Sequence, residues 1–192
     1  KLMKLIDLLL EKITNHLPCR IINDGDVPYL ERYYLFTMMG FTFYLHKFVG
    51  SDPDRGLHCH PWRMAFSIIL SGWYWEETRY GIRKIKWFNS LTGDTFHRVV
   101  LNNQRKERIV WEQGHRRFSG EYDFVQMPCW TLFFHTSKNV KPWGFLRQPV
   151  RPTENYPAVD YLIFEPYKYT REGSQKDWWL TAPTGREFRI NK

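Results

Sequence analysis

Cysteine is scarce in this chain, and its spacing is irregular. Only Cys19, Cys59 and Cys129 occur among 192 residues, with no CxxC pair. Small secreted domains instead carry paired cysteines at framework spacings. The odd number therefore indicates a reducing compartment, and we expect Cys59 and Cys129 to be small buried hydrophobic residues rather than nucleophiles.

Long hydrophobic runs are also missing. The apolar stretches are far shorter than the roughly 18 residues needed to cross a bilayer. The opening segment KLMKLIDLLLEKI is too charged after its first turn to be a secretory signal. There is no repeat and no low-complexity tract. We expect a soluble, cytoplasmic protein with no membrane partner, of a length that suits one domain.

Charge is plentiful but is not gathered into a dense basic run. Lys and Arg outnumber Asp and Glu by 28 to 20, which gives a net charge of +8. Such a field would attract an anionic partner, such as a nucleic acid, a nucleotide or a carboxylate substrate. A solvated cationic surface without a partner explains the same balance. Charge alone therefore leaves the partner open.

Aromatic residues, by contrast, are abundant. They make up 18% of the chain and include nine Trp, which favours extensive β-structure or an aromatic-lined pocket. Short runs rich in β-branched and aromatic residues alternate with turn signals, and the runs are RYYLFTM, FTFYLHKF, RMAFSIIL, GWYWEETRY, IRKIKWF, TFHRVVL, YDFVQM and CWTLFFH. This pattern predicts an all-β antiparallel sandwich, jelly roll or barrel over residues 30–146.

The two ends of the chain differ from this middle part. Residues 1–20 predict one amphipathic helix packed on the barrel, with its apolar stripe formed by Leu2, Leu5, Ile6, Leu9 and Ile13. Residues 147–192 are punctuated by Pro and Gly, with one possible strand at 160–164. They predict an extended tail of the same domain that wraps the barrel or makes an oligomer contact.

The segment RGLHCHPW contains the strongest functional signal. Side chains two apart on a strand share a face, so His58 and His60 point one way and Cys59 the other. A third histidine, His97, begins a later strand in GDTFHRVVL. Neutral imidazoles suit Fe, Mn, Ni, Cu and Zn, and three of them leave coordination positions open. An accidental pair, with one exposed and one buried histidine, is the alternative.

These residues also carry a family resemblance. HCHPWRMAFSIILSG resembles the first conserved motif of the cupin superfamily, and GDTFHRV resembles the second. The wider pattern is similar to a small HxHPW subgroup of cupins, over roughly residues 34–145. The resemblance implies a jelly roll, or double-stranded β-helix, with a divalent metal bound inside by His58, His60 and His97. By analogy it also implies a homodimer.

The motif departs from the usual cupin pattern at one position. Its glutamate falls on Ala65, so the site has three histidines and no carboxylate unless Glu76 or Glu77 adds a fourth ligand. In this it resembles cupins that cleave thiols or diketones with dioxygen. Three neutral ligands leave the metal's charge intact, which favours an anionic co-ligand. We therefore expect an iron(II), oxygen-dependent, dioxygenase-like oxidoreductase for a small or nucleotide-sized anionic substrate.

Further candidates surround the predicted ligands. Arg63 and Arg98 flank them and are the expected cations for an anionic substrate. His46 and His135 either line the pocket or are buried and hydrogen-bonded to the backbone. Several tryptophans could stack on a planar substrate, namely Trp62, Trp73, Trp75, Trp130 and Trp143.

Two other functional classes stay open. Aromatic strands with basic loops can bind single-stranded nucleic acid, and the segment NNQRKERIVWEQGHRRF is the loop or hairpin that would do so. The other class is a cupin without redox chemistry, which would act as a metal-dependent isomerase or a sensor. Oxygen consumption separates the oxidoreductase from both.

Overall fold

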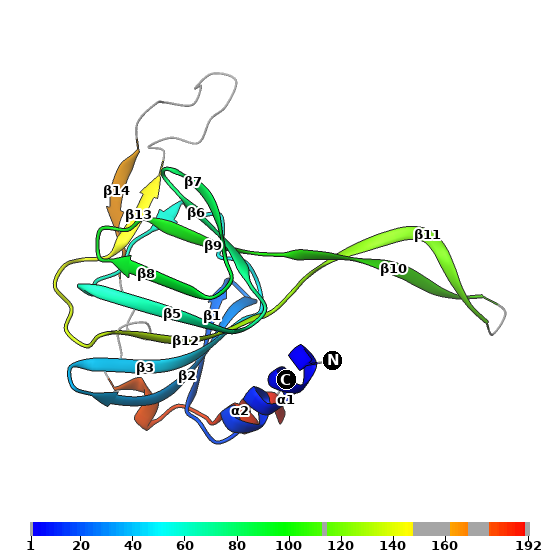
Figure 1. Ribbon diagram of the computed structural model, residues 1–192, viewed down its shortest axis with the longest axis horizontal. Helices are drawn as coiled ribbons and strands as arrows, with labels where there is room; N and C mark the ends of the chain where they lie inside the picture. Colours follow the sequence, from blue (N-terminus) through cyan, green and yellow to red (C-terminus); the bar gives the residue numbers. More distant parts are fainter. Residues whose placement is uncertain (1, 113–114, 148–161, 169–176, 191–192) are drawn as a thin grey trace.

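Two six-stranded antiparallel sheets enclose the interior of the protein, in a computed structural model that describes residues 2–112, 115–147, 162–168 and 177–190. The strand orders are β1-β2-β3-β12-β5-β8 and β14-β13-β4-β9-β6-β7. Figure 1 shows the sheets curving around a common interior, with the helices below the first sheet. The predicted all-β jelly roll with an N-terminal helix is confirmed.

The elements follow one another along the chain with short connections. In order they are α1 Leu2–Thr14, β1 Cys19–Asp24, β2 Val27–Met38, β3 Phe41–Phe48, β4 Leu57–His58, β5 Met64–Ser71, β6 Tyr74–Thr78, β7 Gly81–Ile85, β8 Phe88–Thr92, β9 His97–Leu101, β10 Asn103–Glu112, β11 His115–Gln126, β12 Cys129–Thr136, β13 Gly144–Arg147, β14 Ile163–Pro166, the 3₁₀ turn η1 Trp178–Leu180 and α2 Gly185–Ile190.

Strand β3 shows why this sequence lines a cavity. Because side chains alternate along a strand, Thr42, Tyr44, His46 and Phe48 all point inward and line the interior cavity. Leu45 lies on the other face, in the cluster that receives the helices. A strand that alternates polar or aromatic residues inward with apolar residues outward can serve a cavity and a core at once.

Helix α1 docks on the outer face of the first sheet, but through only one described member of the predicted stripe, Ile6. Leu10 and Thr14 are buried and Ile6 is partly buried, at i, i+4 spacing, packed near Tyr33 and Trp130. The exposed fractions of predicted stripe members are 64% for Leu5, 56% for Leu9 and 44% for Ile13. The predicted N-terminal helix is present, and its docking face is shifted from the predicted stripe toward Leu10, because many apolar residues allow more than one stripe.

Helix α2 holds α1 in place. Arg189 donates hydrogen bonds to Asn15 and, at 2.6 Å, to Thr14 Oγ1. It also donates to Tyr33 Oη at 3.2 Å. In the part of the chain that the structure describes, no helix is long and apolar enough to span a membrane.

The described C-terminal residues match the predicted tail at its one strand and differ from it at η1 and α2. Strand β14 pairs with β13 close to the predicted position, but η1 and α2 are helical. Trp178 of η1 is buried and stacks on Tyr44 with ring centroids 6.4 Å apart. The segment therefore returns to the barrel and closes part of its interior.

Strands β10 and β11 form a two-stranded ribbon of their own. Figure 1 shows the ribbon projecting well beyond the barrel. It contains most of the segment NNQRKERIVWEQGHRRF, for which a loop or hairpin was expected. At its base, Gln126 Oε1 accepts a hydrogen bond from the Ser51 backbone N–H at 2.9 Å. The side chains of residues 107–120 lie outside the description, so nucleic-acid binding by this ribbon stays a prediction.

Candidate metal centre and cavity

The three histidines of the two motifs meet at one point. One ligand nitrogen from each of His58, His60 and His97 lies within 4.8 Å of the other two. Nε2 of His60 is 2.9 Å from Nε2 of His97. The ring centroids of His58 and His97 are 4.7 Å apart. The structure thus brings together all the residues that the sequence proposed as ligands.

Local structure explains this convergence. His58 lies directly opposite His97 in the antiparallel pair of β4 and β9, and such pairs place their side chains side by side. His60 follows β4, and its ring stacks on Trp62 with centroids 5.1 Å apart. Before the motif, Gly56 has φ of +95° and packs against the Leu146 carbonyl, where a Cβ would clash.

Two of the three imidazoles each have their own carboxylate behind them. Nδ1 of His97 donates to Glu76 Oε1 at 2.9 Å, since an ionised carboxylate only accepts. Nδ1 of His58 faces Asp52 Oδ2 at 3.9 Å, and Asp52 in turn accepts from the Val99 backbone N–H at 2.7 Å. The hydrogen bond to Glu76 leaves Nε2 of His97 facing His60, and carboxylates placed behind imidazoles in this way orient metal-bound histidines.

Glu76 answers the question of a fourth ligand. Its carboxylate is fully buried and also accepts hydrogen bonds at 2.6 Å from Asn89 Nδ2 and from Arg83 Nε. Burial raises the pKa of Glu76, but these hydrogen bonds and the one from His97 outweigh burial and bring the pKa below its ordinary value. Glu76 therefore supports His97 from behind, while Glu77 on the opposite face pairs with Arg98.

The electrostatics favour neutral imidazoles. Burial lowers the pKa of His58 and of His60 well below 6.5, and neighbouring basic groups lower each pKa further. Neutral imidazole is the form that binds a metal. Nitrogens bound to one ion at roughly 2.1 Å lie about 3 Å from one another, a spacing that the 2.9 Å between His60 and His97 already matches. The donor set fits a divalent metal ion.

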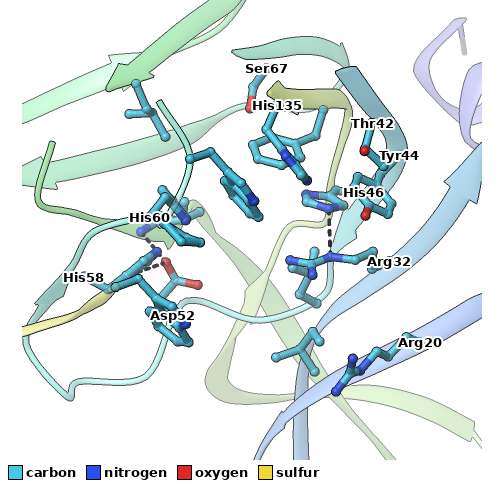
Figure 2. A pocket seen from close by; sticks show the side chains of 18 of the residues that line it. Arg20, Arg32, Thr42, Tyr44, His46, Asp52, His58, His60, Ser67 and His135 are labelled. Carbon is cyan, nitrogen blue, oxygen red and sulfur yellow. Dashed lines mark hydrogen bonds and ion pairs between the residues drawn. The ribbon is translucent and has the colours of Figure 1, made fainter. Parts of the chain in front are cut away.

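The histidine cluster opens onto a cavity of about 1090 Å³. Figure 2 shows His58, His60 and Asp52 on one side and His46, Tyr44 and Arg32 on the other. This volume lies just above the usual range for small-molecule sites.

Arg63 and Arg98 are placed differently from the expectation. Arg63 is exposed, and neither arginine is among the described residues that line the cavity. Arg98 instead donates to Glu77 and, at 2.6 Å, to Asp54 Oδ1 on the outer face of the second sheet. Arg98 directly follows His97 on β9, so strand alternation turns it to the opposite face.

Aromatic and sulfur-containing candidates divide between cavity and core. Trp62 and Trp143 line the cavity, whereas Trp130 is buried in the core beneath α1. Cys59 and Cys129 are both fully buried and unbridged, as expected of small hydrophobic residues. Burial raises the pKa of the Cys129 thiol to about 12, far from a nucleophile.

Other cavity residues had no distinct signal in the sequence. His46 and His135 both line the cavity, and Nδ1 of His135 also hydrogen-bonds to the Thr136 backbone carbonyl at 2.9 Å, so for His135 both expected outcomes hold. Strict alternation in FTFYLHKF could have fixed the direction of His46. Arg32 and Trp178 were missed, because Arg32 lies between two buried residues in a strand with mixed patterning and Trp178 arrives from the far end of the chain.

The jelly roll brings the histidines of the HxH motif and of a later strand to one interior point, the arrangement that the resemblance to cupins in the sequence implied. No protein-family model matches the chain. No curated protein matches it.

Among solved structures the chain is similar to two cupin-2 proteins and to an ectoine synthase. A cupin-2 domain from Rhodospirillum rubrum is 12% identical, with a TM-score of 0.45 over 73% of this chain and 78% of that one. A cupin 2 conserved barrel protein from Rhodopseudomonas palustris is 11% identical, with a TM-score of 0.44 over 73% and 79%. An ectoine synthase from P. lautus is 11% identical, with a TM-score of 0.36 over 60% and 67%.

Proposed function

We propose that the protein is a metal-dependent enzyme in which His58, His60 and His97 bind one divalent ion. Iron(II) is the first candidate for this ion. One observation carries the proposal: three imidazoles converge inside a cavity, and Glu76 and Asp52 stand behind two of them. Mn, Ni, Cu and Zn accept the same donor set and are the alternatives. Carboxylates placed behind imidazoles are characteristic of metal sites and have little use in a merely hydrophobic interior.

We propose further that the enzyme is an oxygen-dependent oxidoreductase for an anionic substrate. Ala65 is buried where the usual cupin motif has its glutamate, so the three ligands are all neutral. When bound, iron(II) would supply a redox-active cation with open positions and an uncompensated charge. The chain itself would hold a proton on His97 Nδ1 through Glu76 and exclude water with the aromatic wall around Trp62.

Metal analysis of protein purified without a histidine tag tests the first step. We expect about one metal ion per folded chain, and none in the double variant His58→Ala/His97→Ala. His16→Ala is the matched control, because His16 is exposed on the outside of the barrel and should leave the metal content unchanged. Equal metal content in the double variant and the wild type would refute the three-histidine centre.

Oxygen uptake tests the second step. The iron-loaded protein is screened with carboxylates, thiols and nucleotides, and uptake that requires both iron and one of these substrates supports the oxidoreductase. Metal binding without uptake would instead favour an isomerase or a sensor. Oligonucleotide binding that falls steeply with salt would favour the nucleic-acid alternative.

A further inference from the structure

The cavity has a second charged end, across from the histidine cluster. Arg32 of β2 points into the cavity beside His46, and Figure 2 shows it facing the side that holds His58 and His60. The sequence singled out neither Arg32 nor β2 as part of a site. The proposed metal chemistry also leaves the guanidinium without a role.

Arg32 has no acidic partner among the residues that the structure describes. Its Nε donates to His46 Nε2 at 3.2 Å, and its guanidinium carbon lies 5.5 Å from the centre of the Tyr44 ring. Among the residues that the structure describes, no acidic side chain forms an ion pair with it. Two acidic residues do line the cavity, but Asp52 faces His58 and Asp177 is exposed.

A guanidinium inside the cavity without a described acidic partner costs folding free energy. A charge removed from water is stabilised only by a counter-charge or by several hydrogen bonds. Burial lowers the pKa of Arg32, which reflects the same cost. The fork of a guanidinium matches the two oxygens of a carboxylate or phosphate group. An anionic ligand would therefore supply what the protein lacks here.

His46 fixes the direction of this fork. Burial lowers the pKa of His46 well below 6.5, and the charge of Arg32 lowers it further. The imidazole is therefore neutral and can accept at Nε2 the hydrogen bond that Arg32 Nε donates. With Nε held, the two terminal NH₂ groups are left for a ligand. His46 thus acts as a positioning residue.

A wall of stacked rings joins the two ends of the cavity. It runs from His60 to Trp62, then His135, then Tyr44, with successive centroids 5.1, 3.6 and 5.6 Å apart. Such a wall favours the flat or apolar body of a ligand over a small inorganic ion. The cavity of about 1090 Å³ is large enough for a ligand that reaches both ends.

We propose that Arg32 anchors the carboxylate or phosphate group of an elongated substrate, whose unsaturated body lies along the ring wall and whose other end reaches the histidine cluster. This substrate class rests on the proposed function, but the anchor itself does not. Carboxylates and phosphates share the chemistry that the Arg32 guanidinium would recognise, and the probes below separate the two.

Binding of small aromatic anions to the full chain tests the anchor. Benzoate and phenyl phosphate are titrated calorimetrically, with benzamide as the uncharged analogue of benzoate, before and after treatment with EDTA. We expect at least one anion to bind with and without metal, and benzamide to bind at least tenfold more weakly. Arg32→Met should weaken anion binding about tenfold or more, as loss of a charge-assisted bond predicts.

The control is Arg63→Met, which removes the same charge from an exposed site outside the cavity and should leave anion binding unchanged. Arg32→Lys keeps the charge but loses the fork, and we expect intermediate binding. In wild-type protein, nuclear Overhauser effects should connect the benzoate ring with Tyr44.

Three results would overturn the anchor: no anion binding by wild type at millimolar concentration, equal binding by Arg32→Met, or Overhauser contacts confined to another surface. Failure of the metal centre is distinguishable, since it abolishes metal content and leaves anion binding by EDTA-treated protein intact.

Discussion

Glu76 and Glu77 are neighbours with opposite surroundings. Glu76 points inward, where it accepts a hydrogen bond from His97 Nδ1, and Glu77 points outward to Arg98. Alternation along β6 is the whole cause of the difference. Sequence reasoning identified both as candidates for a ligand, and only the pairing of β6 with β9 shows that Glu76 supports a ligand instead.

Glu76→Gln should weaken metal binding about 10- to 100-fold, because the amide no longer holds His97 as a carboxylate does. Competition with a chromogenic chelator measures the affinity. Glu77→Gln is the matched control, and we expect a change of less than about twofold, since a partly exposed ion pair contributes little. Equal losses in the two variants would contradict the supporting role of Glu76.

At the scale of elements, α1 shows how packing selects one face of an ambiguous helix. The sequence of Leu2–Thr14 offers apolar residues on most of its circumference. The barrel receives Ile6 and Leu10, while Leu9 remains 56% exposed. The choice depends on Tyr33 and Trp130 in the sheet beneath, whose positions no local pattern reveals.

Leu10→Ala should therefore lower the free energy of unfolding by about 2 to 4 kcal/mol, the usual cost of a cavity in a core. Leu9→Ala should change it by less than about 0.5 kcal/mol, as for an exposed position. Urea denaturation followed by tryptophan fluorescence measures both. A larger loss for Leu9→Ala than for Leu10→Ala would mean that the predicted stripe docks after all.

Strand periodicity was the most informative signal in the sequence. The run FTFYLHKF coincides with β3, and RMAFSIIL and CWTLFFH lie almost entirely within β5 and β12. Strand β1 escaped notice because CRIIND is short and half polar, and it pairs across a Gly25 turn whose φ is +57°. Strand β4 consists only of Leu57 and His58, and a strand of this length is too short to show any periodicity in the sequence.

At the scale of the whole molecule, the interior concentrates histidines that resist protonation. Burial lowers the pKa of His46, His58 and His60 well below 6.5, and that of His135 to about 4. In the unfolded chain each returns to its ordinary value. Below pH 6.5 the unfolded state thus binds protons that the folded state does not, and stability falls.

We expect metal-free protein to lose stability as the pH falls from about 6.5 toward 5, by up to about 1.4 kcal/mol per pH unit for each of these histidines. Asp52 acts in the opposite sense, because burial raises its pKa and its protonation favours the fold. Urea denaturation in EDTA at a series of pH values measures the slope. His135→Gln should reduce it and His16→Ala should not; a stability independent of pH would exclude neutral interior histidines.

The homodimer and the cytoplasmic location stay predictions at this scale. So does a nucleic-acid partner. The net charge of +8 suits any anionic partner, and the cavity gives one such charge, Arg32, a specific place.

The sequence alone predicted an all-β fold and a cluster of His58, His60 and His97, because strand alternation and short histidine motifs act over a few residues and need no knowledge of the remainder. Tertiary structure alone decided that Glu76 supports His97 and that Arg32, rather than Arg63 or Arg98, faces the cavity. It also brought Trp178 back to close the interior. Those facts depend on which strands pair and curve together, and strand pairing is set by contacts among residues far apart in the chain.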